Sequence, residues 1–278
     1  MGIAFALAAS ACWGSADFFG GLKAKRWSAL SVLFTIEVSG LVLGVVVLAI
    51  AGDPFPSTRA VLCALGAGTA GIVALGAFYR ALAIGTMSIV APISATGVAL
   101  PVIVGIATGD RPGPVVIVGL VVTTLGVVLA SREVHEDAEQ ASAGRMSIIL
   151  ALLAAVGFGT YFIGADVAAD ESVLWTVVLG RAIAVPVVGL AVLARGVPLP
   201  RGNDLRILCA AGAVDLLATG LYGFANTHGD LSIVSVVGSL YPIATVVLAR
   251  AILHERVRAV QAAGVVAALT GVALIAVG

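Results

Sequence analysis

The sequence predicts an all-α integral membrane protein with ten transmembrane helices, arranged as two inverted repeats of five helices each. The 278 residues are 60% hydrophobic and only 11% charged, whereas a soluble domain carries about 25% charged residues. The apolar residues form continuous spans rather than alternating patterns, which favours helices over a β-barrel. The second half of the chain also repeats the spacing of the first, and each half contains an odd number of spans.

Ten apolar spans, each close to the length needed to cross a bilayer, are separated by short polar breaks. Several breaks contain residues that end helices, such as Asp53-Pro54 and Gly85. We interpret the first span as a retained membrane helix rather than a signal peptide, because no basic segment precedes it. The predicted spans are 3–21, 29–51, 60–84, 87–108, 115–131, 147–166, 172–194, 205–228, 231–253 and 257–277.

The two halves match at nearly constant offsets of 144 or 145 residues, which indicates an internal duplication. Matching pairs include Gly76 with Gly220, Ser88 with Ser232, Asp110 with Glu255, and Gly126 with Gly271. We predict a first repeat over 1–131, a polar linker over 132–145 and a second repeat over 146–278. Because five is odd, the second repeat crosses the membrane in the opposite direction. In such folds the substrate site is expected near the midplane, where the repeats meet.

Basic residues are concentrated in loops on one face of this ten-span arrangement. They include Lys23, Lys25, Arg26, Arg195, Arg201 and Arg206. The positive-inside rule makes this face cytoplasmic and places both termini outside the cytoplasm. The formal net charge is +0, so nothing indicates a nucleic-acid partner.

The eighth span carries a carboxylate, Asp215, near its middle. Helical spacing places Thr219, Tyr222 and Asn226 on the same face. A charge at the bilayer centre costs about 2.5–3.5 kcal/mol on insertion scales, so it needs a partner, water or a proton. We interpret this stripe as part of a substrate or proton pathway. A structural hydrogen-bond stripe against a neighbouring helix is the alternative.

The first span offers a second candidate face, with Trp13 and Asp17 one turn apart. Trp13 is either a cavity wall for an apolar or cationic substrate or a packing residue. Asp17 is either part of the pathway or an interfacial acid paired with the loop at Lys23. In the ninth span, Ser235 and Ser239 share one face, where they either line a wet path or allow close helix packing.

Two charged residues occupy equivalent positions in the two halves: Glu37 in the second span and Arg181 in the seventh, at an offset of 144. If they meet, they form an intramembrane ion pair across the pseudo-two-fold axis, which either holds the halves together or acts as a gate. Helix bends are expected at three prolines inside the fourth and ninth spans. These are Pro92, Pro101 and Pro242.

Residues that commonly hold metals or perform catalysis form no recognisable pattern. The three histidines are scattered, without metal-ligand spacing. Cys12, Cys63 and Cys209 lie inside apolar spans and fit neither a disulfide framework nor a metal site. Because a phosphate-binding glycine loop and a nucleophile elbow are also missing, we expect no enzyme activity, no catalytic residue, no metal and no cofactor.

Several of these motifs resemble the EamA-type, ten-helix branch of the drug/metabolite transporter superfamily, and the resemblance covers nearly the whole chain. They are Trp13-Gly14-Ser15, Phe78-Tyr79-Arg80-Ala81-Leu82, Ala91-Pro92, and the segments that begin at Asp110-Arg111 and Glu255-Arg256. The resemblance implies secondary transport of small metabolites, often export. It also implies a cavity lined by the first, third, fourth, sixth, eighth and ninth helices. The family is usually drawn with cytoplasmic termini, contrary to the charge distribution here.

We therefore favour a secondary transporter that exports small organic metabolites by alternating access, with proton coupling as a further hypothesis. The alternatives are a multidrug or cation efflux permease, a non-transporting assembly partner, and an intramembrane enzyme that pairs Asp17 with Asp215. The expected partners are a small-molecule substrate and the lipid bilayer of the cell membrane, which the chain crosses many times. A homodimer is left open.

Overall fold

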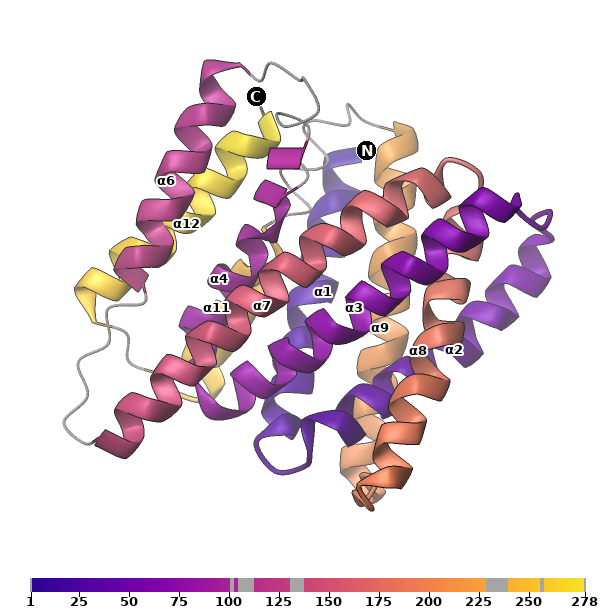
Figure 1. Ribbon diagram of the computed structural model, residues 1–278, viewed down its shortest axis with the longest axis horizontal. Helices are drawn as coiled ribbons and strands as arrows, with labels where there is room; N and C mark the ends of the chain where they lie inside the picture. Colours follow the sequence, from indigo (N-terminus) through magenta and orange to yellow (C-terminus); the bar gives the residue numbers. More distant parts are fainter. Residues whose placement is uncertain are drawn as a thin grey trace.

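The computed structural model describes residues 2–100, 103–104, 113–130, 138–228, 240–255 and 258–277. These residues form ten α-helices and a short 3-10 helix (Figure 1). Each α-helix overlaps one predicted span, in the same order, so the predicted fold class is confirmed. The elements are α1 (Gly2–Ala24), α2 (Ala29–Ala51), α3 (Thr58–Ile84), α4 (Met87–Ala95), η1 (Thr96–Val98), α6 (Pro114–Ala130), α7 (Ala138–Ala169), α8 (Val173–Ala194), α9 (Gly202–His228), α11 (Tyr241–Ile252) and α12 (Ala259–Val277).

Six of these helices, α1, α2, α3, α7, α8 and α9, are long and apolar enough to cross a membrane. Shorter apolar stretches lie in α6, α11 and α12. Large aliphatic side chains on the outside of the bundle, such as Ile50 and Leu193, are exposed. In water such a surface would be unfavourable, but in a bilayer these side chains face acyl chains that are equally apolar.

Serine residues begin three of the helices. Ser28, Ser57 and Ser172 precede α2, α3 and α8, and each hydroxyl oxygen accepts a hydrogen bond from a backbone amide in the first turn. Each contact satisfies one of the amides that have no partner within the helix. Gly52 ends α2 in the left-handed conformation, with φ of 70°, where glycine avoids the strain of a side chain.

The helices pack in pairs related by a pseudo-two-fold axis. Helix α1 packs along α9, and its counterpart in the second repeat, α7, packs along α3. Three helices pack directly against their own counterparts: α2 on α8, α4 on α11, and α6 on α12. Figure 1 shows the α6–α12 pair at one edge of the bundle and the α2–α8 pair toward the other. Every one of these contacts therefore joins a helix of one repeat to a helix of the other, as expected of an inverted repeat.

Close glycine contacts repeat across this axis. A Cβ atom on Gly68 of α3 would lie 2.5 Å from the Cα atom of Gly180 on α8. The equivalent Gly212 of α9 would place a Cβ atom 2.5 Å from the carbonyl oxygen of Ile36 on α2. Ile36 and Gly180 are themselves equivalent, at an offset of 144. The duplication therefore preserves the same pair of close helix crossings on both sides of the axis.

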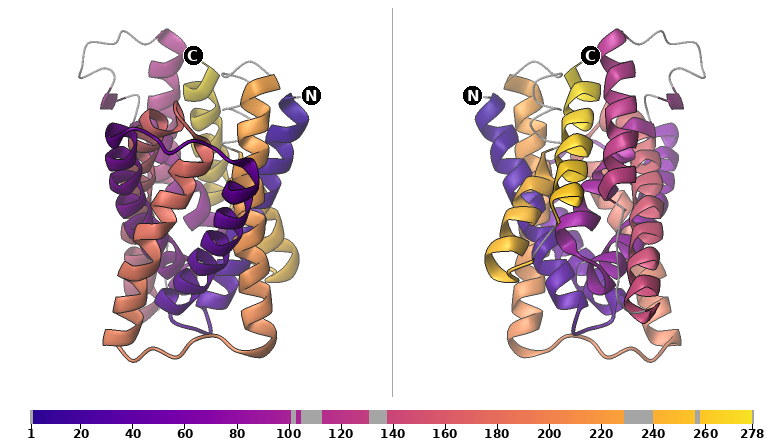
Figure 2. Two further views of the ribbon diagram at one scale, coloured as in Figure 1. Left: turned by 90° about the vertical axis from the view of Figure 1, so that its right-hand side faces the viewer. Right: turned by 90° about the vertical axis from the view of Figure 1, so that its left-hand side faces the viewer.

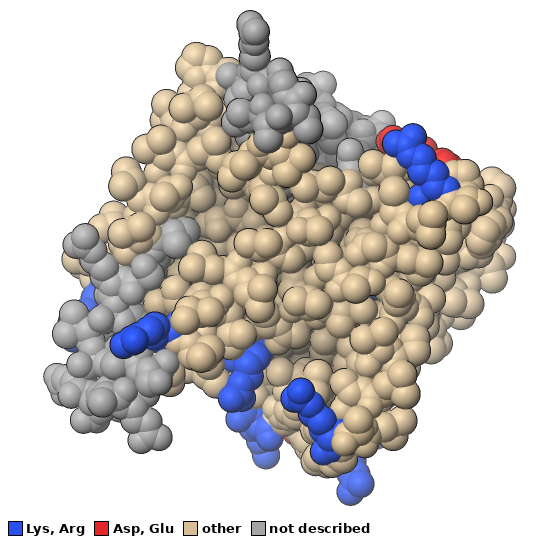
Figure 3. Space-filling view, viewed as in Figure 1, with Lys and Arg blue, Asp and Glu red and all other residues tan. Residues whose placement is uncertain are grey.

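The two chain termini lie on the same side of the bundle (Figure 2). Most visible lysine and arginine side chains gather along the opposite edge, whereas one basic side chain lies beside acidic ones at the upper right (Figure 3). Lys23 at the end of α1 and Arg195 at the end of α8 belong to the basic loops singled out in the sequence. We call this side, opposite the termini, the basic face.

Some local details differ from the sequence expectation. Helix α7 already begins at Ala138, so residues 138–145 of the segment predicted as a linker are helical. Pro92 lies inside α4, and that helix passes into η1 after Ala95. Pro242 lies in the first turn of α11, where a proline fits without bending the helix. Pro101 lies outside the described residues.

Candidate functional site

Glu37 and Arg181 are the buried charged residues of the described chain, and they meet where α2 packs on α8. Arg181 Nη1 donates a hydrogen bond to Glu37 Oε2 across 3.4 Å. The two side chains are only 7% and 10% exposed, with Glu37 the more buried. Because the two positions are equivalent in the repeats, this ion pair lies at the pseudo-two-fold axis and links the two halves. The contact that the offset suggested is present.

Arg181 also has a second partner. Its Nη2 atom donates a hydrogen bond to Asp215 Oδ2 on α9. The Asp215 side chain is 30% exposed, although it lies in the middle of its helix. The guanidinium therefore joins a sealed carboxylate in the first repeat to a more accessible one in the second repeat.

Glycine residues provide the space for this cluster. A Cβ atom on Gly40 would overlap Arg181 Nη1, so only glycine lets the guanidinium pass α2 here. Gly71, the counterpart of Asp215, leaves room for the ring of Tyr161, which a Cβ atom would approach to 3.2 Å. The same position thus holds a carboxylate in one repeat and accommodates an aromatic ring in the other.

The cluster carries more negative than positive charge. Asp17 on α1 lies close enough to Asp215 for the two carboxylates to repel each other. No basic residue of the described chain forms an ion pair with Asp17. Two carboxylates, those of Glu37 and Asp215, therefore share the guanidinium of Arg181, and Asp17 adds a third negative charge beside Asp215. Uncompensated charge is costly away from water, so protons or a bound cation are needed to offset the excess.

Aromatic side chains surround the carboxylates. Trp13 and Tyr222 stack at a tilt, with ring centroids 5.5 Å apart, between α1 and α9. Tyr79 of α3 lies against Gly20 of α1 and interacts electrostatically with Asp17. Tyr241 of α11 also interacts electrostatically with Asp17. These groups come from helices that include α1, α3, α9 and α11, which are the first, third, eighth and ninth α-helices in chain order.

The sequence-predicted residues divide into three groups. Asp215, Glu37 and Arg181 form one cluster, and Trp13 contacts Tyr222 nearby. Thr219 lies one turn from Asp215, but its hydroxyl donates to the Asp215 carbonyl oxygen over 3.1 Å, so it supports the helix rather than the carboxylate. The side chain of Asn226, and all of Ser235 and Ser239, lie outside what the structure describes.

Lys23 does not pair with Asp17, so the interpretation of Asp17 as an interfacial acid held by that loop is wrong. Lys23 Nζ instead lies 2.6 Å from Asp204 Oδ1 at the start of α9. Sequence reasoning missed the contact between Arg181 and Asp215, and the tyrosines around it. The sequence signal for these contacts was a pair of glycines, Gly40 and Gly71. Each of them leaves space on its helix for a large side chain of a neighbouring helix.

Polar ties hold helix ends together on both faces. On the basic face, Asp204 accepts hydrogen bonds from Lys23 and from the Trp27 indole, at 2.6 and 2.8 Å. Nearby, Glu255 accepts hydrogen bonds from the backbone amides of Met87 and Ser88, at 3.0 and 2.9 Å. These contacts connect the ends of α1, α9, α4 and α11 on that face.

On the face that carries the termini, the α2–α3 loop is tied to the α7–α8 loop. Asp53 accepts a hydrogen bond from the Ser172 hydroxyl over 2.6 Å. Glu171 accepts hydrogen bonds from the hydroxyl and the backbone amide of Ser57. These bonds favour the carboxylate form and lower the pKa of Glu171 from its ordinary value of 4.5.

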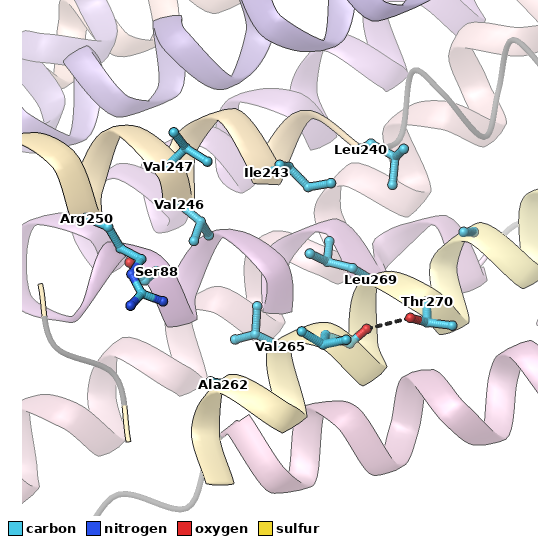
Figure 4. Close-up of a pocket in the computed structure, with 12 residues that line it drawn as sticks. Ser88, Leu240, Ile243, Val246, Val247, Arg250, Ala262, Val265, Leu269 and Thr270 are labelled. Atoms are coloured by element: carbon cyan, nitrogen blue, oxygen red, sulfur yellow. Dashed lines mark hydrogen bonds between the residues drawn. The ribbon is translucent and has the colours of Figure 1, made fainter. Parts of the chain in front are cut away.

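A separate hollow of about 480 Å³ lies between α11 and α12 (Figure 4). Its walls are aliphatic side chains, with Arg250 and Ser88 together at one end and Leu240 at the other. None of the residues of the charged cluster lines it. The hollow and the charged cluster are therefore different sites.

Two five-helix repeats that enclose charged groups within the membrane define a multi-pass membrane transporter of the inverted-repeat class. The family comparison gives the particular family. The model of the EamA-like transporter family matches residues 1–132 and 145–277, and the chain belongs to this family. It is accordingly a membrane transporter of small molecules.

A solved structure supports the same fold. A protein of known crystal structure superposes with a TM-score of 0.61 at 16% sequence identity. The match covers 96% of this chain and 96% of that chain, so the whole fold is shared. No curated protein matches the sequence.

Proposed function

We propose that this protein is a secondary transporter that exports small organic metabolites across the cell membrane by alternating access between its two repeats. The observation that carries the proposal is the position of Asp215, an accessible carboxylate that pairs with the same Arg181 guanidinium that links the repeats through Glu37. Whatever neutralises Asp215 also changes how strongly Arg181 binds Glu37. The basic face is proposed to be cytoplasmic, in line with the positive-inside rule.

Glu37 and Asp215 compete for Arg181, and this competition couples substrate binding to helix packing. Glu37 and Asp215 both attract Arg181, but only Glu37 lies in the other repeat. A proton or substrate on Asp215 weakens its hold on Arg181, which then interacts more fully with Glu37. A ligand shifts a conformational equilibrium by the difference in its affinity for the two states. We infer that protonation of Asp215 provides this difference and couples export to a proton gradient.

An organic cation is the second candidate substrate. The excess of carboxylates over guanidinium groups in the described cluster favours a positively charged ligand, which would restore neutrality. The rings of Trp13 and Tyr222, which contact each other on the helices that carry Asp17 and Asp215, are suited to contact such a cation. A neutral metabolite would instead require protons to offset the charge. The two substrate classes therefore differ in how transport responds to pH.

A solute screen in reconstituted vesicles with an imposed pH gradient tests the proposal. Asp215→Asn is expected to lower flux by about tenfold or more, equivalent to about 1.4 kcal/mol of lost interaction, and to remove the pH dependence. This variant should still fold, because Glu37 and Arg181 remain as a neutral pair. Asp170→Asn, an exposed acid outside the cluster, is the matched control. Unchanged gradient-driven flux in Asp215→Asn would count against the proposal.

A further inference from the structure

The hollow between α11 and α12 is an apolar groove with one polar end. Ile243, Val247 and Val266 on its walls are 44%, 58% and 63% exposed, so the groove opens to the outside of the bundle. Val265 at its base is buried. A groove on this surface faces the hydrocarbon region of the bilayer, which consists of lipid acyl chains.

Hydrogen-bonding groups inside the groove are already used, except at one end. The Thr270 hydroxyl donates to the Val266 carbonyl oxygen over 2.8 Å (Figure 4). The Ser88 hydroxyl donates to Glu255 over 2.9 Å. Within the described chain, Arg250 has neither an ion-pair nor a hydrogen-bond partner. Its guanidinium is therefore the group at this end that is available to a ligand, and the ligand group it favours is an anion.

The dimensions and position of the groove match one leaflet. Arg250 lies in the last turn of α11, near the basic face, and Leu240 lies at the other end of the groove. The helix between these two residues rises through about 15 Å, which is about half the thickness of the hydrocarbon core. The volume of about 480 Å³ is also within the range of small-molecule sites.

We propose that this groove binds one acyl chain of an anionic phospholipid from the leaflet at the basic face, with the lipid phosphate against Arg250. The proposal is independent of the transported substrate, because the groove shares no residue with the charged cluster. Its occupant would lie between α11 and α12 and contact α4 through Ser88. Lipid bound there would stabilise the packing of these three helices.

The test is thermal unfolding of the detergent-purified protein during titration with phosphatidylglycerol or phosphatidylcholine. Phosphatidylglycerol should raise the unfolding temperature at lower concentration than phosphatidylcholine does. Arg250→Gln should weaken the phosphatidylglycerol effect by about fivefold, the contribution expected of one basic residue at an anionic surface. Arg195→Gln, at the basic-face end of α8, should leave it unchanged. Equal responses to the two lipids, or equal behaviour of the two variants, would overturn the proposal.

A second set of variants tests the acyl-chain site without changing charge. Ala262→Phe and Ala273→Phe each place a ring in the groove while Arg250 stays in place. Either variant should lose the stabilisation by phosphatidylglycerol and co-purify with less of it, as measured by mass spectrometry of the extracted lipid. Full stabilisation in both filled variants would show that the lipid binds elsewhere and would exclude the groove.

Discussion

The two repeats of this transporter preserve their packing but differ in their charges. Gly68 and Gly212 make equivalent close crossings, at the same offset that relates the repeats. At the axis, the same offset pairs Glu37 with Arg181, residues of opposite charge. About one helical turn beyond the crossing glycines, a glycine of the first repeat corresponds to Asp215 of the second. Positions that set helix distance are thus duplicated, whereas positions that carry charge are not.

This difference separates what the fold needs from what transport needs. Close helix crossings are required on both sides of the axis, because each repeat must pack against the other. A charge at the axis needs one partner of opposite sign, which two different residues at equivalent positions provide. Asp215 exceeds that requirement, since Glu37 alone would neutralise Arg181. The additional carboxylate is therefore the strongest indication of a functional asymmetry.

The largest effect is expected when the shared guanidinium is removed. Arg181→Met leaves Glu37 buried without its partner, and breaking a buried pair costs about 3–5 kcal/mol. We expect a large fall in the unfolding temperature or in the yield of folded protein, measured by size-exclusion chromatography in detergent. The loss should exceed that caused by Asp215→Asn, because that change leaves a neutral pair.

The double variant Glu37→Met with Arg181→Met distinguishes an ion-pair requirement from a packing requirement. Replacing both partners by apolar residues of similar volume is often neutral or stabilising, so much of the lost stability should return. Transport should stay low, because Asp215 still lacks its guanidinium. A double variant that transports normally would show that the asymmetry at the axis is not functional.

Much of the fold, but less of the site, could be predicted from the sequence. Apolar length and periodicity determine the positions of helices, and the offset of 144 relates Glu37 to Arg181 on sequence grounds alone. The contact of Arg181 with Asp215 could not be predicted, because it depends on how α8 and α9 are rotated toward each other. Lys23 likewise pairs with Asp204 rather than Asp17 because the antiparallel packing of α1 on α9 brings their ends together.

The two equivalent helix crossings can each be disrupted by replacing the glycine at the contact. Gly68→Ala and Gly212→Ala each place a methyl group against backbone atoms of the facing helix. Each should lower the free energy of unfolding by about 1–3 kcal/mol through overpacking. Chemical or thermal unfolding in detergent would measure this, and similar losses at both positions would support equivalent roles in the two repeats.

Matched controls lie on the same two helices. A Cβ atom on Gly66 of α3 or Gly220 of α9 would meet no neighbour within 4 Å. Alanine there should be neutral or stabilise by up to about 1 kcal/mol, because glycine is a weaker helix former. If the control variants lose as much stability as the crossing variants, close approach is not the reason for glycine at positions 68 and 212.

The smallest effect on stability is expected from the polar contacts that tie helix ends together on the two faces. Lys23 and Asp204 form a partly buried ion pair on the basic face, whereas Glu171 and Ser57 form an exposed hydrogen-bonded tie on the other. The bonds from Ser57 lower the pKa of Glu171 below its ordinary value of 4.5. A carboxyl group whose pKa is lowered by folding stabilises the protein above its unfolded pKa, and the contribution disappears as pH falls through the folded value.

Glu171→Gln should therefore unfold at a slightly lower temperature than the wild type at pH 7, and the difference should disappear as the pH is lowered well below the ordinary glutamate pKa of 4.5, through the lowered pKa of the folded state. Thermal unfolding at both pH values would measure it, with Asp170→Asn as a control for removing a neighbouring charge from the same loop. The effect is small because exposed interactions are screened by water and salt. A difference between wild type and Glu171→Gln that grows as the pH falls would show that the carboxylate is not the stabilising form, and that the tie on this face does not depend on its charge.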